Sequence, residues 1–224
     1  MRVAFVVGLY AVAMAYVEAA VVVDLNGALG QQMGALFPLR PELRSGPLIL
    51  IEVGREAATV VMLATLGVVA GRSAVERLAW SAVAFGTWDI GYYAWLHVFT
   101  GWPPDLGTWD VLFLIPVPWT GPVWAPVAVS AALVGFGLAV ARRLRAGGVV
   151  RLSPWRLAAG VAGGLLVVVS FTLDSGRVAA GAIPTDYPWP ILAAGVALAA
   201  AGALLSLRPA GVSFLTADRA ERGG

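Results

Sequence analysis

The sequence places its most reactive side chains in two helical patterns. Glu52 and Glu56 are four residues apart, so a helix would carry both on one face, with Arg55 beside them. Carboxyl groups in this arrangement can bind a cation, or exchange protons with a substrate as general acid and base. Glu56 is therefore a candidate catalytic residue as well as a candidate ligand-binding residue.

The second pattern consists of Asp89, Tyr93 and His97, which also recur every four residues. If the two helices are antiparallel neighbours, Glu56 lies at the level of Asp89, and Glu52 lies at the level of Tyr93 and His97. We therefore expect a single cavity, with Asp89 as the second catalytic candidate. The candidate ligand-binding residues are Glu18, Glu52, Arg55, Glu56, Asp89, Tyr92, Tyr93 and His97.

A divalent metal ion is one ligand that this set could hold, because carboxylate and imidazole groups are suitable ligands for such ions. The candidate metal ligands are Glu52, Glu56, Asp89 and His97. Composition excludes several other cofactors. The chain has no cysteine and one histidine, so cysteine-ligated clusters and bis-histidine haem cannot form.

Composition also indicates that these helices lie in a membrane. Apolar residues make up 59% of the chain and charged residues 12%, and the mean hydropathy is +0.83. A soluble domain would carry about 25% charged residues. A net charge of +2 and scattered arginines argue against nucleic acid as a partner. We expect an integral membrane protein whose main partner is the lipid bilayer.

Six apolar runs approach the length of about 20 residues that crosses a bilayer. They cover residues 3–23, 47–70, 77–99, 123–141, 155–173 and 190–207. The runs are continuously apolar, which favours helices over a β-barrel. The predicted fold class is all-α, a polytopic helix bundle in one transmembrane domain, 1–224. Its parts are polar-site helices at about 3–99, a proline-rich outer segment at 102–126, packing helices at about 123–207 and a cytoplasmic tail at 208–224.

The last two runs have no ionisable residue in their interiors. Gly160 and Gly164 lie in the fifth run, and Gly195 and Gly202 lie in the sixth. Small residues at such spacing let membrane helices approach closely. We expect these two runs to serve for packing.

Arginines predict the orientation of the chain. Eleven lie in the connections on the side of the two termini and three on the opposite side, while Arg55 lies within a span. Both termini are therefore expected in the cytoplasm, with the polar residues in the outer half of the cell (inner) membrane. The first run is interpreted as an uncleaved helix, because Glu18 lies where a signal peptide needs a small residue.

The segment before the fourth run differs from its neighbours because it is rich in proline. Pro116, Pro118, Pro122 and Pro126 cannot share an uninterrupted helix. We expect a re-entrant or interfacial segment on the outer side. The alternative is a long fourth helix that is kinked at its prolines.

Charge balance gives the strongest functional indication. Four carboxyl groups oppose one guanidinium, namely Glu18, Glu52, Glu56 and Asp89 against Arg55. An ionised group at mid-membrane costs about 2.5 to 3.5 kcal/mol, so these side chains should face the protein interior. The excess negative charge then requires protonation, bound water or a bound cation. A purely structural alternative is that Arg55 bridges to Glu52 or Asp89 and clamps two helices together.

Three functions fit these observations. The first is an outward-facing acidic pocket that binds or translocates a cation, a metal ion or a small polar solute. The second is an accessory subunit that packs against a membrane protein partner or against further copies of itself in a homo-oligomer. The third is an intramembrane enzyme that uses Glu56 and Asp89 on a lipid-like or quinone-like substrate.

Overall fold

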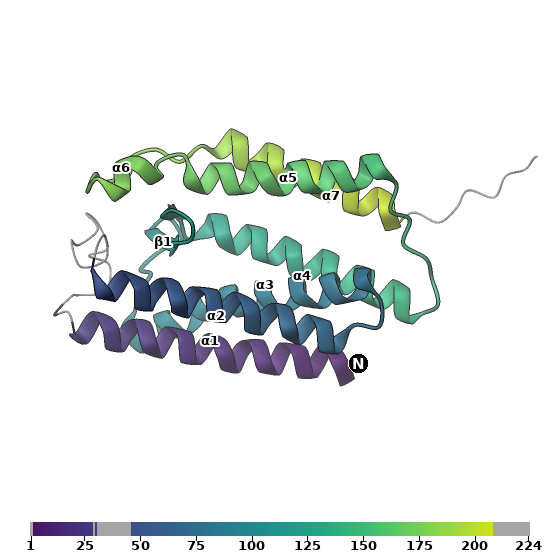
Figure 1. Cartoon of the computed structure of the whole chain (residues 1–224), viewed down its shortest axis with the longest axis horizontal. Coiled ribbons are helices and arrows are strands. Elements are labelled where there is room, and N and C mark those ends of the chain that lie inside the picture. Colours follow the sequence, from purple (N-terminus) through teal and green to yellow (C-terminus); the bar gives the residue numbers. More distant parts are fainter. Residues whose placement is uncertain (1, 29, 31–45, 208–224) are drawn as a thin grey trace, which may run out of the picture.

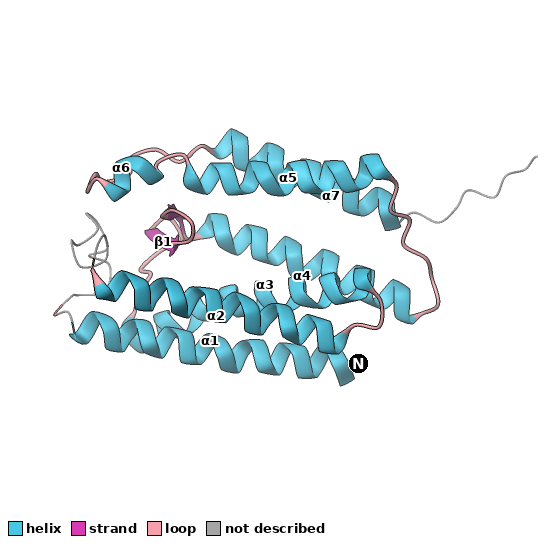
Figure 2. Ribbon diagram, in the orientation of Figure 1, coloured by secondary structure: helices cyan, strands magenta, loops and turns pink. Residues whose placement is uncertain are grey.

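Long helices dominate the protein, which is represented by a computed structural model that describes residues 2–28, 30 and 46–207 (Figure 1). The long helices are α1 (Arg2–Ala28), α2 (Pro47–Ala70), α3 (Ala74–Thr100), α4 (Trp124–Arg145), α5 (Pro154–Thr172) and α7 (Trp189–Leu207). A five-residue helix, α6 (Ser175–Ala179), follows α5. Apart from one small sheet the described chain is all-helical, as predicted (Figure 2). The predicted tail at 208–224 lies outside the described residues.

Five described helical segments are long and apolar enough to cross a membrane. They are α1, α2, α4, the stretch Pro154–Ala179 and α7. The predicted run 47–70 coincides with α2. The ends of the other runs lie within four residues of the helix ends, except that α1 continues beyond its predicted run to Ala28. The remaining predicted span, 77–99, corresponds to α3, which is equally long but is not among these five apolar helices.

Helix α3 carries more polar residues because its neighbours shield it. It packs against α1, α2 and α4, and Glu76, Asp89 and Tyr93 are among its buried side chains. A polar group can remain inside an apolar bundle when protein atoms supply its hydrogen bonds. The position of α3 therefore brings polar side chains into the middle of the bundle.

The ends of α2 and α3 follow local sequence signals. Pro47 occupies the first turn of α2, where its missing N–H costs no hydrogen bond. At the start of α3 the Ser73 hydroxyl accepts from Glu76 N at 3.2 Å, and the Glu76 carboxylate accepts from Arg72 N at 3.0 Å, which forms a capping box. Gly101 ends α3 in the left-handed conformation.

The proline-rich segment forms a β-hairpin. Strand β1 (Trp109–Phe113) pairs antiparallel with β2 (Trp119–Pro122), with Asp110 opposite Gly121 and an irregularity between Val111 and Phe113. The kinked-helix alternative is wrong, because α4 begins only at Trp124. Prolines exclude a continuous helix, and pairing the two short strands satisfies backbone groups that would otherwise be buried without partners.

Helices α5 and α7 pack closely through glycine (Figure 1). A methyl group on Gly163 would lie 2.6 Å from the carbonyl oxygen of Gly195, so neither position has room for a side chain. Gly202 also faces α5, as expected. The expectation was wrong for Gly160 and Gly164, since nothing lies within 4 Å of where either methyl group would be.

One end of the bundle holds the start of the first helix and the end of the last. Helix α1 begins and α7 ends at the same end of the bundle (Figure 1). The connection between α4 and α5 lies at this end too, where Arg151 N donates to Ser206 O at 3.1 Å. A buried Glu76 carboxylate pairs there with Arg145 Nε at 2.5 Å and joins α3 to α4. We call this the arginine-rich end, because it holds Arg142–Arg156.

Candidate functional site

Helices α1, α2 and α3 and strand β1 enclose a polar cavity of about 110 Å³. Its polar lining comes from four elements. The side chains are Glu18 and Asn26 on α1, Glu52, Arg55, Glu56 and Thr59 on α2, Asp89, Tyr92 and Tyr93 on α3, and Asp110 on β1. Seven of the eight expected ligand-binding residues therefore line one cavity, and His97 does not.

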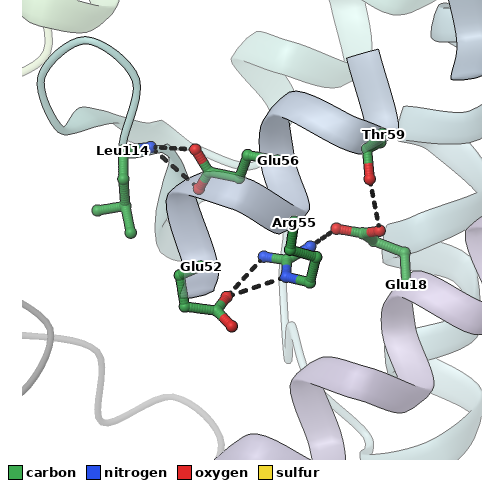
Figure 3. A network of polar contacts seen from close by, with 6 residues as sticks. All are labelled: Glu18, Glu52, Arg55, Glu56, Thr59 and Leu114. Atoms are coloured by element: carbon green, nitrogen blue, oxygen red, sulfur yellow. Dashed lines mark hydrogen bonds and ion pairs between the residues drawn. The ribbon is translucent and has the colours of Figure 1, made fainter. Parts of the chain in front are cut away.

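Arg55 forms a network with two acidic side chains (Figure 3). Its Nε and Nη2 atoms donate to Glu52 Oε2 at 3.0 and 2.8 Å, and its Nη1 atom pairs with Glu18 Oε1. Thr59 donates its hydroxyl to the other oxygen of Glu18 at 3.1 Å. The structural alternative expected Arg55 to meet Glu52 or Asp89. The guanidinium pairs with Glu52 and Glu18 rather than with Asp89, and it therefore links α2 to α1.

Glu56 binds the hairpin (Figure 3). Both of its carboxylate oxygens accept from the backbone N–H of Leu114, at 3.0 and 2.8 Å. Leu114 follows β1 directly, so this contact fixes the end of the strand against α2. Among the described residues, the Glu56 carboxylate forms no ion pair.

Asp89 and Asp110 likewise accept hydrogen bonds from neutral donors. Ser130 on α4 donates its hydroxyl to Asp89 at 2.8 Å. Tyr93 donates its phenol to Asp110 at 2.9 Å, and the backbone N–H of Val111 donates to Asp110 at 2.8 Å. Within the described ranges neither aspartate forms an ion pair. In the described part of the chain, three carboxyl groups of the cavity, Glu56 included, therefore form no ion pair.

Asp110 is the titratable group of the cavity that belongs to the hairpin rather than to a helix. Burial raises the pKa of its carboxyl to about 7, although hydrogen bonds from Tyr93 and Val111 oppose this shift. The neighbouring carboxylate of Asp89 adds to the increase in pKa. Asp110 therefore changes its charge near neutral pH.

His97 lies outside the cavity. Its Nδ1 atom is 3.0 Å from the carbonyl oxygen of Pro103, in the segment that follows α3. In the part of the chain that the structure describes, no three His, Cys, Asp or Glu side chains are close enough together to hold a metal ion. The expected combination of Glu52, Glu56, Asp89 and His97 therefore does not assemble as a ligand set.

The sequence patterns did not indicate several residues that line the cavity, Asp110 and Trp88 among them. Asp110 lies in WDVLF, whose residue types are typical of a half-buried strand, so the helical spacing of the other acids does not extend to it. Trp88 lines the cavity with Tyr92, and their rings stack with centroids 6.3 Å apart. Tyr93 contacts Tyr92 edge-on at 5.2 Å. Aromatic faces therefore accompany the carboxyl groups.

Comparisons of the chain with protein-family models, with curated proteins and with solved structures found no match. The chemistry of the cavity follows from its own atoms. Carboxylates and aromatic faces both attract cations, whereas the single guanidinium is already engaged by two acids.

Proposed function

We propose that the cavity binds a small polyatomic cation, such as an organic ammonium ion. The five apolar helices are compatible with an integral membrane protein. We further propose that both termini face the cytoplasm, as the arginine distribution predicts, which would place the cavity in the outer half of the membrane.

The imbalance of charge carries this proposal. Five carboxyl groups line the cavity together with one guanidinium. Glu18 and Glu52 share that guanidinium, which leaves Glu56, Asp89 and Asp110 with neutral donors. A cation among these three groups would offset the cost of ionising them in a place of low polarity.

The spacing of the acids favours a polyatomic ion over a metal ion. A metal ion needs several ligands within about 2.0 to 2.6 Å, and the described residues offer no such group of three. An ammonium group on an organic body needs only longer hydrogen bonds, and its apolar part would contact aromatic faces. Trp88 and Tyr92 supply such faces.

A binding measurement tests the proposal directly. The purified protein is titrated by calorimetry with methylammonium and tetramethylammonium chloride against sodium chloride at equal ionic strength. We expect saturable binding of at least one ammonium probe. The double variant Glu56→Gln, Asp89→Asn should bind it at least about ten-fold more weakly, because two opposite charges are lost.

These substitutions should keep the fold, because each new amide oxygen can still accept from Leu114 N or from Ser130. Asp24→Asn is the matched control, since Asp24 is an exposed acid on α1 that does not line the cavity. Equal affinity in the double variant and the control would contradict the proposal. Absence of saturable binding of both ammonium probes to the unmodified protein would do the same.

A further inference from the structure

A second cavity lies beside α3 and α4. It occupies about 360 Å³ between these two helices and the α5–α7 pair, and its lining is almost entirely apolar. Representative lining residues are Leu78, Leu133, Phe136, Gly164, Val196 and Ala200. We call it the apolar groove. None of its lining residues lines the polar cavity, so the two sites are separate.

Physical chemistry limits what can fill the apolar groove. Its walls belong to helices that are apolar enough to cross a membrane, apart from α3. Water gains few hydrogen bonds in an apolar space of this kind, whereas hydrocarbon enters it readily. Within a bilayer the nearest hydrocarbon is a lipid acyl chain.

Arginines continue two of the groove-lining helix faces toward the arginine-rich end. On α4 the face that contains Phe136 and Val140 also contains Arg143, which lies three residues after Val140. On α5 the face of Val167 reaches Arg156 three turns earlier, about 16 Å along the axis. A chain lying in the apolar groove would therefore end beside positive charge from two helices.

Both arginines keep their charge free of acidic partners among the described residues. Arg143 Nε donates to the carbonyl oxygen of Val149 at 2.9 Å, and Arg156 Nη1 donates to that of Arg151 at 3.1 Å. Neither forms an ion pair there, unlike Arg145. The Arg156 Nε atom is buried and has no hydrogen-bond acceptor in the described part of the chain.

We propose that the apolar groove holds an acyl chain of an anionic phospholipid, whose phosphate binds Arg143 and Arg156. Guanidinium groups suit this role because their planar donors match phosphate oxygens in pairs. The buried Nε of Arg156 would then gain an acceptor. The lipid would also fill the space between the α3–α4 and α5–α7 pairs and so hold them together.

Native mass spectrometry can test this proposal on the full chain. The protein is reconstituted into nanodiscs of equal phosphatidylglycerol and phosphatidylcholine, extracted gently and weighed with its retained lipid. We expect one retained phosphatidylglycerol. In the double variant Arg143→Gln, Arg156→Gln the preference for phosphatidylglycerol should fall by on the order of ten-fold. Arg177→Gln removes an arginine that pairs with Asp174 near the other end of α5 and should leave the preference unchanged.

Filling the apolar groove gives a second, independent arm. Gly164→Leu should abolish retention of both lipids, because Gly164 lines the groove and has open space beside it. Gly135→Leu is the matched control, since Gly135 is an exposed α4 glycine that lies outside the groove. If Gly164→Leu does not fold, the arginine variants still decide the question.

Three outcomes would overturn the proposal. The unmodified protein could retain the two lipids equally or retain neither. Free inorganic phosphate could bind to Arg143 and Arg156 without any loss of lipid mass, which would assign the arginines to a soluble anion. Finally, a lipid-free dimer that Gly164→Leu dissociates would assign the apolar groove to a second copy of this chain.

Discussion

The two halves of the bundle are held together by different forces. Helices α1, α2 and α3 enclose acids and one guanidinium, and side-chain hydrogen bonds join them to each other and to the hairpin. Helices α5 and α7 approach through Gly163 and Gly195, and their contact contains no ion pair among the described residues. One half depends on charge and the other on shape.

This difference explains where a ligand site can form. At the Gly163–Gly195 contact the backbones of α5 and α7 lie so close that no ligand fits between these two helices, and the apolar groove lies beside that contact. In the polar half, each carboxyl group needs donors, and the single guanidinium cannot supply them all. The unequal charge of the polar half therefore favours a bound cation, whereas the α5–α7 pair presents only apolar surface to a ligand in the apolar groove.

Removal of the guanidinium should have the largest effect. Arg55→Met leaves the buried acids Glu18 and Glu52 without their partner, and we expect the free energy of unfolding to fall by about 3 kcal/mol. Reversible unfolding in mixed micelles measures it. The triple variant with Glu18→Gln and Glu52→Gln should recover most of the loss. A failure to recover would mean that Arg55 acts through packing rather than charge.

A methyl group in the glycine contact should have the next largest effect. Gly163→Ala places its methyl group 2.5 Å from Ala199 N, and we expect a loss of about 2 kcal/mol. Gly160→Ala, one turn away with open space at its methyl position, should instead stabilise the helix by about 0.5 kcal/mol. Opposite signs in the same unfolding assay would confirm that shape governs α5 and α7. Equal signs would contradict it.

The dependence of stability on pH should separate the two halves further. Between about pH 4 and pH 7, folded Asp110 still holds its proton because its pKa is about 7, whereas Asp110 in the unfolded chain has already released it. The free energy of unfolding should therefore fall as pH rises, by about 1 kcal/mol between pH 6 and pH 7. Asp110→Asn should make this slope shallower. An unchanged slope would assign it to another group.

Loss of one hydroxyl from the packing half should have the smallest effect. Tyr187 and Ser170 share a hydrogen bond of 3.0 Å, and Ser170 also donates to Val167 O. Tyr187→Phe should cost about 0.5 to 1 kcal/mol in the unfolding assay. It should not alter binding of an ammonium probe, because Tyr187 does not line the polar cavity. Weaker probe binding would show that the halves are coupled.

Much of the helical frame could be predicted from the sequence. The run 47–70 coincides with α2, because Pro47 and the change from apolar to polar residues after Ala70 are local signals. The hairpin could not be predicted as readily. Prolines indicated only that residues 109–126 are not one straight helix, while strand pairing depends on the register between Asp110 and Gly121.

The candidate site was predictable only in part. Helical spacing brought Glu52, Glu56 and Asp89 to the correct neighbourhood, and all three line the cavity. The same spacing placed His97 with them, yet the end of α3 carries that side chain toward Pro103. Asp110 enters from a strand that no helical period describes.

The sequence by itself determined that long apolar helices form and that acids in the first three of them outnumber the one arginine nearby. Hydropathy and helical rise depend only on residues that are close together in the chain, so each apolar segment by itself indicates that it forms a long helix. Only the tertiary structure decided that Arg55 pairs with Glu18 across two helices and that Glu56 binds the backbone of Leu114. Hydrogen bonds and ion pairs act over a few ångströms, so their partners are chosen by packing between segments that are distant in the chain.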